Sequence, residues 1–309
     1  MPKLSIITVN LNNKNGLVDT AESVIAQTWT DYEWIIIDGG STDGSVEVIK
    51  KYVDKTDKLV YWCSEPDGGI YQGMNKGIEK AGGEYCWFLN SGDYAYKNTT
   101  LAEIFANEFD EDIVYGDMEF TLPAKLITKH PYLEVNFFDF VKNTKNKNPC
   151  RIANWCGCMI IPHQASFIKR ELLIRLGLYN TKNYTMAADK EFLIRSIFKH
   201  NAKVKHVKNI FATFVLDGAS SAFSNNKTQR LLLVEDGRTI MENFPDSYVK
   251  LFAKQYIRQK FGSLCLPFVL MKYLFIRIKK FGFSKTMDYY IKRITFKKND
   301  AAEDMWRQY

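Results

Sequence analysis

The chain has 309 residues, enough for one large core or for one core with a small appendage. A hydrophobic share of 46% and a charged share of 25% are typical of globular proteins, which excludes a wholly disordered chain. Six scattered cysteines are too few for a disulfide scaffold. The first residues do not resemble a signal peptide, so we expect a cytoplasmic protein with reduced thiols.

The net charge of +7 is concentrated at the end of the chain. Residues 246–309 contain 14 Lys and Arg but 5 Asp and Glu, whereas the preceding 245 residues hold 28 basic and 30 acidic side chains. A basic tail behind a near-neutral body is typical of a partner-binding segment. It argues against nucleic-acid binding by the body.

The first part of the chain alternates strands with helices. Short apolar runs rich in β-branched residues predict buried strands, and apolar residues three or four apart predict helices. The expected elements are a strand at 4–9, a helix at 17–27, a strand at 34–38, a helix at 46–53, a strand at 59–62, a helix at 70–81 and a strand at 85–89. This order predicts an α/β fold with a mostly parallel central sheet and helices on both faces.

Beyond residue 110 the alternation is looser. We expect a strand at 113–117, helices at 169–176 and 187–199, a strand at 204–215 and a helix near 228–242. Pro245 then marks a natural boundary. The sequence therefore predicts one large domain at 1–245 and a basic helical tail at 246–309.

Polar side chains follow four consecutive predicted strands. In chain order they are Thr8, Asn10, Asp38, Asp67, Asn90 and Asp93. Ligands of parallel α/β sheets bind beyond the carboxyl ends of the strands, so these residues predict a nucleotide site. Asp93 suits Mg²⁺ or Mn²⁺, which prefer oxygen ligands and commonly bridge phosphates. Helix capping by Asp38 and a simple turn at Asp93 are the structural alternatives.

Other nucleotide and metal motifs are missing or weak. Neither a G-x-G-x-x-G nor a G-x-x-x-x-G-K-[ST] segment occurs, which disfavours dinucleotide-binding and P-loop proteins. Cys156 and Cys158, with Cys150 and His163 nearby, lack the spacing of a zinc site. Ordinary buried thiols are the better interpretation of these cysteines.

A series of short motifs, in order, resembles the inverting nucleotide-sugar glycosyltransferases of family 2, which have the GT-A fold. The matching segments are residues 5–10, 36–44, 65–71, 74–77, 83–93, 162–164, 188–193 and 218–220. They span about the first three quarters of the chain. The resemblance implies a hexosyltransferase that uses a nucleotide-sugar donor, with inversion. Its acceptor would be a glycan or lipid-linked hydroxyl in cell-surface polysaccharide synthesis.

The same resemblance implies roles for individual donor-side residues. Thr8, Asn10 and Asp38 match positions that hold the nucleotide base, with Asp38 binding the uracil N3–H of a UDP-sugar. Asp67 and Asn75 match further donor-side positions.

Three more residues match the reacting end of such a site. Asp93 matches the carboxylate that binds a divalent metal, Mg²⁺ or Mn²⁺. Asp189 matches the base that deprotonates the acceptor. His163 matches a position near the acceptor pocket, where a purely structural hydrogen bond is an equal alternative.

The chain departs from the family pattern at three places. Residues 90–93 hold one carboxylate where two or three are frequent, Ala188 stands where Glu is frequent, and Gly39 replaces a second Asp. The first departure predicts weaker metal dependence, because bound diphosphate then supplies much of the coordination.

The tail contains an apolar stretch flanked by cations. Residues 263–276 are 14 residues long with one charge, shorter than the roughly 20 residues of a spanning helix. Apolar and basic residues together predict association with an anionic membrane surface, at the inner face of the cytoplasmic membrane. The alternative is that the tail packs on the catalytic domain.

Two other function classes stay open. A sugar-1-phosphate nucleotidyltransferase would require a Gly-rich basic loop after the first strand, where residues 10–16 hold a single Lys. A non-catalytic, membrane-surface glycan-binding protein is favoured by the reduced acidic motif at 90–93.

Overall fold

The computed structural model describes residues 1–121, 127–128, 161–215, 231–232, 235, 238–239 and 242–243. All of them belong to one compact unit, Met1–Val249. The predicted tail, the cysteines at 150, 156 and 158, and the motif at 218–220 lie outside the described residues.

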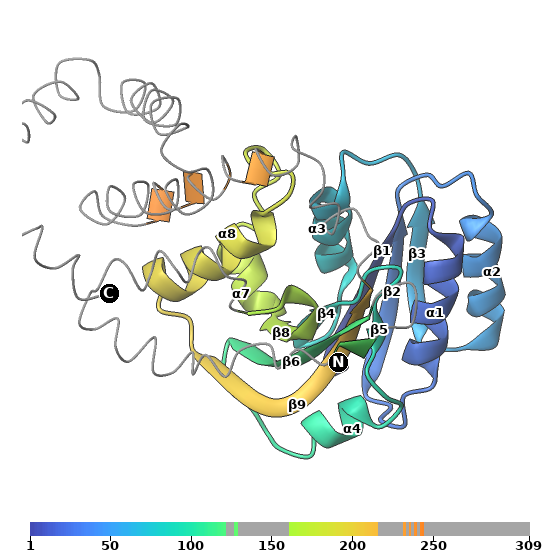
Figure 1. Ribbon diagram of the computed structural model, residues 1–309, viewed down its shortest axis with the longest axis horizontal. Helices are drawn as coiled ribbons and strands as arrows, with labels where there is room; N and C mark the ends of the chain where they lie inside the picture. Colours follow the sequence, from blue (N-terminus) through green and yellow to red (C-terminus); the bar gives the residue numbers. More distant parts are fainter. Residues whose placement is uncertain are drawn as a thin grey trace, which may run out of the picture. The chain divides into compact units, whose positions relative to one another are not determined.

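The described residues form a central sheet with helices on both faces (Figure 1). The strands are β1 (Leu4–Asn10), β2 (Tyr32–Asp38), β3 (Leu59–Ser64), β4 (Tyr85–Phe88), β5 (Tyr94–Ala95), β6 (Ile113–Thr121), β7 (Ile127–Thr128), β8 (Ser166–Lys169) and β9 (Val204–Val215). The helices are α1 (Lys14–Ile25), α2 (Ser45–Lys55), α3 (Ile70–Lys80), α4 (Thr100–Ile104), the 3₁₀ turn η1 (His163–Ala165), α7 (Arg170–Arg175), α8 (Ala188–Ile194) and the π-helical turn η2 (Arg195–Lys199).

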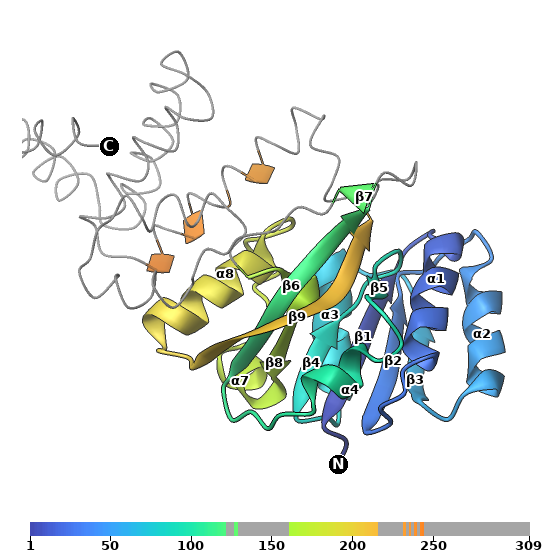
Figure 2. The ribbon, with the colours of Figure 1, turned by 60° about the horizontal axis from the view of Figure 1, so that its bottom comes forward.

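The sheet is parallel in its first half and mixed in its second. The strand order is β3-β2-β1-β4-β8-β6-β9-β5, with β7 paired to β6. Strands β1 to β4 pair in parallel, which confirms the predicted alternation. β8 runs antiparallel between β4 and β6, whereas β6 and β9 run parallel side by side (Figure 2).

Helices α1 and α2 cover one face of the parallel strands, and α3 covers the other. On the first face, Leu17 and Val24 of α1 pack with Trp34 of β2. On the second, a Cβ atom at Gly77 would lie 2.4 Å from Cγ2 of Ile7 on β1. Glycine therefore lets α3 lie close to β1, with the N-terminal turn of α3 near the carboxyl ends of the strands.

One element boundary and one whole strand differ from the expected elements for local reasons. Helix α1 begins at Lys14, earlier than expected, because Oδ1 of Asn13 accepts a hydrogen bond from the N–H of Gly16 (3.2 Å) and caps the helix. The sequence does not predict β8, because the chain passes directly from this strand into α7 at Arg170 without a turn signal. The described positions between 231 and 243 are helical, as predicted. Within the described ranges no helix is long and apolar enough to cross a membrane.

Replacing Gly77 with alanine tests the close packing of α3 on β1. Alanine favours the helix by up to about 1 kcal/mol, but overpacking against the fully buried, β-branched Ile7 costs about 1–3 kcal/mol. We expect Gly77→Ala to lower the free energy of unfolding by about 1 kcal/mol in urea titrations. Glu79→Ala, on the exposed side of α3, should change it by less than about 0.5 kcal/mol. Equal stability of the two variants would contradict this account.

Candidate active site

Asp38, at the carboxyl end of β2, is a fully buried carboxylate surrounded by donors. It accepts hydrogen bonds from Nδ2 of Asn10 (2.6 Å) and the hydroxyl groups of Ser41 and Ser64 (2.6 Å each). The backbone N–H groups of Gly40 and Ser41 add two more. Burial alone raises the pKa of Asp38, but these hydrogen bonds outweigh it and hold the pKa below its ordinary value. Asp38 is therefore an ionised acceptor.

Asn10 stands beside Asp38 because β1 and β2 pair in parallel with these two residues in register. Its side chain is 1% exposed, and its Oδ1 has no hydrogen-bond partner. A buried amide oxygen without a donor is costly. No donor among the described residues satisfies this oxygen.

Asp67 reaches the same edge of the sheet from the loop before α3. Its carboxylate lies 3.4 Å from the position of a Cβ at Gly39, and its Oδ2 lies 3.2 Å from that of a Cβ at Gly73. An aspartate at position 39 would thus bring a second carboxylate against Asp67. Gly39, one of the departures from the family pattern, therefore lies directly beside the carboxylate of Asp67.

Two predicted donor-side residues are engaged within the protein. The hydroxyl group of Thr8, fully buried, accepts from Nε1 of Trp34 (3.0 Å). Asn75 donates to the carbonyl oxygen of Tyr179 (2.9 Å) and accepts from the N–H of Tyr179 (3.0 Å). Their contacts with a donor stay predictions, whereas Asn75 clearly ties α3 to the loop after α7.

Asp93 ends a tight turn that follows β4. Its N–H donates to the carbonyl oxygen of Asn90 (2.9 Å), and Gly92 has a φ of 102°, which favours glycine. Thr20 of α1 fixes this turn: its hydroxyl lies 2.7 Å from the carbonyl oxygen of Asp93 and accepts from the N–H of Gly92 (3.0 Å). The Asp93 side chain is 6% exposed. Helix α1 therefore sets where this carboxylate lies.

The oxygen donors after β4 fit a divalent ion that brings most of its own ligands. The described residues contain no group of three or more His, Cys, Asp or Glu placed to hold a metal. Oδ1 of Asn90 is, however, a second buried oxygen without a hydrogen-bond partner, next to the turn that carries Asp93. Mg²⁺ commonly binds through one or two protein oxygens plus substrate phosphates. This donor set suits that mode of binding.

Asp189, in the first turn of α8, is held by a buried phenol. The hydroxyl of Tyr71 lies 2.7 Å from Oδ1 of Asp189 and 3.0 Å from the carbonyl oxygen of Met186. Burial and the charge of Asp189 raise the pKa of Tyr71, so the phenol keeps its proton and donates. Tyr71 thus joins the first turn of α3 to the candidate base.

His163 lies in the same buried aromatic cluster. Its Nε2 is 2.7 Å from the hydroxyl oxygen of Tyr179, and its ring stacks on Phe88 with the ring centroids 4.8 Å apart. Burial lowers the pKa of His163, and the charge of Asp189 opposes this only in part. The imidazole is therefore neutral at pH 7, which suits the structural interpretation of His163 and leaves its acceptor role a prediction.

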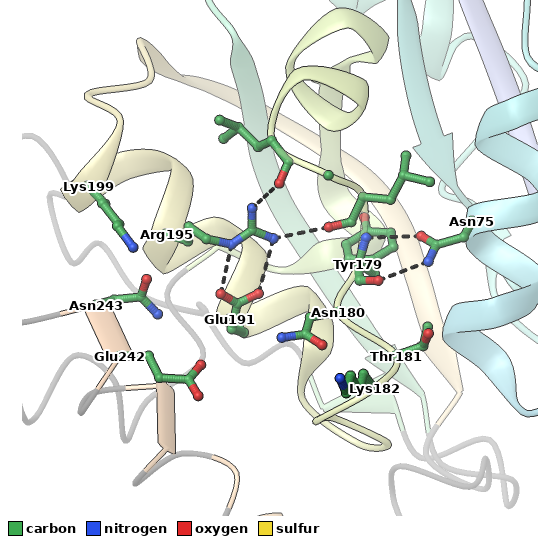
Figure 3. A pocket seen from close by; sticks show the side chains of 13 residues that line it. Asn75, Tyr179, Asn180, Thr181, Lys182, Glu191, Arg195, Lys199, Glu242 and Asn243 are labelled. Carbon is green, nitrogen blue, oxygen red and sulfur yellow. Dashed lines mark hydrogen bonds and ion pairs between the residues drawn. The ribbon is translucent and has the colours of Figure 1, made fainter. Parts of the chain in front are cut away.

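An open pocket of about 520 Å³ lies next to Tyr179, between the loop after α7 and the face of α8 (Figure 3). Arg195 donates to both carboxylate oxygens of Glu191 (2.8 and 3.2 Å) and to the carbonyl oxygens of Leu176 and Leu178. Leu178 has a φ of 63°, a conformation that non-glycine residues rarely adopt. The Arg195–Glu191 pair therefore holds the strained loop that presents Tyr179.

Sequence reasoning missed several residues that build this site. Tyr71 lies inside the matching segment 65–71, but nothing in the sequence predicts a role for its phenol. Thr20 and Tyr179 carried no motif signal, and only the fold brings them to the site.

Several glycosyltransferases are similar to this chain in sequence. A family model described as glycosyl transferase family 2 matches residues 5–173. An uncharacterized glycosyltransferase of Mycobacterium tuberculosis is 33% identical over 202 residues, 63% of this chain and 69% of the relative. A PGL/p-HBAD biosynthesis glycosyltransferase of Mycobacterium bovis is 28% identical over 69% of this chain and 77% of the relative. The putative teichuronic acid biosynthesis glycosyltransferase TuaG of Bacillus subtilis is 36% identical over 150 residues, which are 46% of this chain and 58% of the length of TuaG.

Solved structures share the fold. TarS 1–349 of S. aureus, in complex with UDP, is 17% identical with a TM-score of 0.58, over 83% of this chain and 71% of that chain. The mannosyltransferase PcManGT of Pyrobaculum calidifontis, in complex with GDP-Man and Mn²⁺, is 15% identical with a TM-score of 0.59. The match covers 98% of this chain and 83% of that chain. The predicted GT-A fold is thereby confirmed. Since the family model spans more than half of the chain, the protein belongs to glycosyl transferase family 2.

Proposed function

We propose that this glycosyltransferase moves a hexose from a UDP-sugar to a hydroxyl group of a glycan or lipid-linked acceptor, with inversion, in cell-surface polysaccharide synthesis. The observation that carries this proposal is the hydrogen bond between Tyr71 and Asp189, which places a carboxylate beside the N-terminal turn of α3, near the carboxyl ends of the parallel strands. The names of the M. bovis and B. subtilis relatives support the biosynthetic setting.

The nucleotide end of the proposed site is the Asn10–Asp38 pair. Uracil presents one N–H donor between two carbonyl acceptors. The hydroxyl groups of Ser41 and Ser64 can rotate from Asp38 toward such carbonyls, because a hydroxyl both donates and accepts. That rotation would free acceptor capacity on Asp38 for the uracil N3–H. The UDP complex of TarS supports a uridine donor.

The chemical step is a single displacement at the anomeric carbon. The acceptor oxygen forms its bond from the face opposite the diphosphate, the bond from the anomeric carbon to the diphosphate oxygen breaks, and the acceptor proton passes to Asp189. General-base assistance of this kind contributes typically ~10²–10⁴-fold. Asp93 and Asn90 would hold a divalent ion, which when bound stabilises the charge on the leaving diphosphate as a Lewis acid.

A nucleotide panel tests the donor assignment. We expect calorimetry to show tighter binding of UDP than of GDP or dTDP, and Asp38→Ala to weaken UDP binding by ~1–3 kcal/mol because a buried acceptor is lost. The panel includes GDP because PcManGT was solved with GDP-Man. Preference for GDP would overturn the uridine assignment.

Two carboxylate variants separate the base from the metal ligand. Asp189→Asn should leave UDP affinity unchanged and lower turnover of UDP-sugars by ~10²-fold or more, because only the transition state requires proton removal. Asp93→Asn should lower both Mn²⁺-dependent UDP affinity and turnover. Asp19→Asn, the same change at an exposed carboxylate of α1, serves as the control.

Other outcomes of these assays identify the rival functions. Wild-type turnover in Asp189→Asn would remove the base assignment. A wild-type protein that binds UDP but never releases UDP from a UDP-sugar would favour the non-catalytic alternative. Formation of a UDP-sugar from UTP and a sugar 1-phosphate would show a nucleotidyltransferase.

For the tail we propose binding to an anionic membrane surface. Each Lys or Arg near such a surface contributes about 1 kcal/mol, and the apolar stretch at 263–276 adds burial. We expect the full-length protein to sediment with phosphatidylglycerol vesicles, to be partly released by salt, and to ignore phosphatidylcholine vesicles.

Charge reversal and truncation complete this test. Lys279→Glu with Lys280→Glu should weaken sedimentation, whereas Lys50→Glu with Lys51→Glu on the exposed side of α2 should not. A chain ending at residue 245 should keep UDP binding and lose vesicle binding. If the truncated chain unfolds and the full chain ignores vesicles, the tail is instead a packing element of the domain.

A further inference from the structure

Glu235 is a buried carboxylate outside the matching family segments, and the residues just before α8 surround it. It is 2% exposed. Its Oε1 accepts from the N–H and the hydroxyl of Thr185 (2.8 Å each), and its Oε2 accepts from the N–H groups of Met186 (2.9 Å) and Ala187 (2.8 Å). Four donors from three consecutive residues thus converge on one side chain.

This arrangement fixes the backbone that leads into α8. Consecutive N–H groups form a concavity that binds anions, and here the occupant is a side chain of the same protein. Ala187, the residue before α8, has no side-chain acceptor with which to cap the helix. A buried carboxylate is tolerated only when it is fully hydrogen-bonded, so Glu235 and the turn at 185–187 require each other.

Neighbouring residues of the same helical segment support this contact. Arg238 donates to the carbonyl oxygen of Asn183, and its guanidinium group lies 5.6 Å from the ring centroid of Tyr184. The hydroxyl of Tyr184 donates to Glu242 (3.2 Å). Positions 235, 238 and 242 share one face of a helix, and all three contact residues 183–187.

A short chain of contacts joins Glu235 to the candidate base. Glu235 holds the N–H of Met186, and the carbonyl oxygen of Met186 lies 3.0 Å from the hydroxyl of Tyr71. That hydroxyl is the one that donates to Asp189. We infer that Glu235 is a positioning residue, which sets the place of Asp189 through the turn at 185–187. This inference rests on the proposed function, in which Asp189 is the general base.

Glu235→Gln tests the inference with the full-length chain and the UDP-sugar that the wild type turns over. Glutamine has nearly the same size but places an amide donor against backbone N–H groups. We expect kcat to fall about 10²-fold, as for a slightly misplaced catalytic group, while the affinity for UDP and the KM for the donor stay unchanged. Glu47→Gln makes the same chemical change at an exposed glutamate of α2. It should change kcat by less than about twofold.

The decisive readout is a double-mutant cycle with Asp189→Asn. If Glu235 acts through Asp189, adding Glu235→Gln to Asp189→Asn should cost less than about twofold more. Multiplicative losses, or a wild-type kcat in Glu235→Gln, would overturn the inference. Should Glu235→Gln lose its cooperative thermal transition, Glu235→Asp, which keeps the charge on a shorter side chain, undergoes the same cycle under the same criteria. Wild-type turnover in Asp189→Asn alone would instead overturn the proposed base, so the two failures are distinguishable.

Discussion

The hydrogen bonds that α3 makes to the second half of the chain hold the candidate site together. Tyr71 reaches Asp189, 118 positions away, and Asn75, one turn further along α3, pairs with the backbone of Tyr179 at both of its amide atoms. These contacts join the parallel strands, which carry the proposed nucleotide end, to α8, which carries the proposed base. The Tyr71 phenol is buried, and its hydroxyl is the donor that reaches the carboxylate of Asp189 from α3.

The environments of the carboxylates separate their roles. Asp38 already receives five hydrogen bonds, and its pKa lies below the ordinary value, so it is a poor proton acceptor and a good binding group. Asp189 shows a single hydroxyl donor among the hydrogen bonds described above. In the proposed function, Asp189 therefore accepts the acceptor proton and Asp38 recognises the nucleotide base.

Much of the fold could be predicted because it follows from local pattern. The runs ending at Asn10 and Asp38 are buried on both faces, so they read as continuous apolar strands, and their parallel register then brings these two polar residues together. β8 was missed because Ser166–Lys169 joins α7 without a loop, so no turn signal separates strand from helix. A strand that ends in turn residues can be recognised from the sequence, whereas a strand that continues directly into a helix cannot.

The site was predictable to the extent that its residues follow strands or stand in short motifs. Asp189 could be placed by its motif, but the phenol of Tyr71 that orients it could not, because the contact depends on how α3 crosses β1 at Gly77. The contacts of Glu235 could not be predicted from the sequence for a similar reason. An acidic residue in an amphipathic helix ordinarily faces solvent, and only tertiary contacts show that it is buried against backbone N–H groups.

The departures from the family pattern have a common electrostatic consequence. Glycine at position 39 leaves Asp67 without a neighbouring carboxylate there, and Asn90 offers a neutral oxygen beside the turn of Asp93. Fewer negative charges at the strand ends reduce repulsion of a diphosphate, since like charges a few ångströms apart disfavour each other. They also weaken the protein's own hold on a divalent cation. On the proposed function, cation and diphosphate therefore bind cooperatively, each supplying the opposite charge that the other lacks in this site.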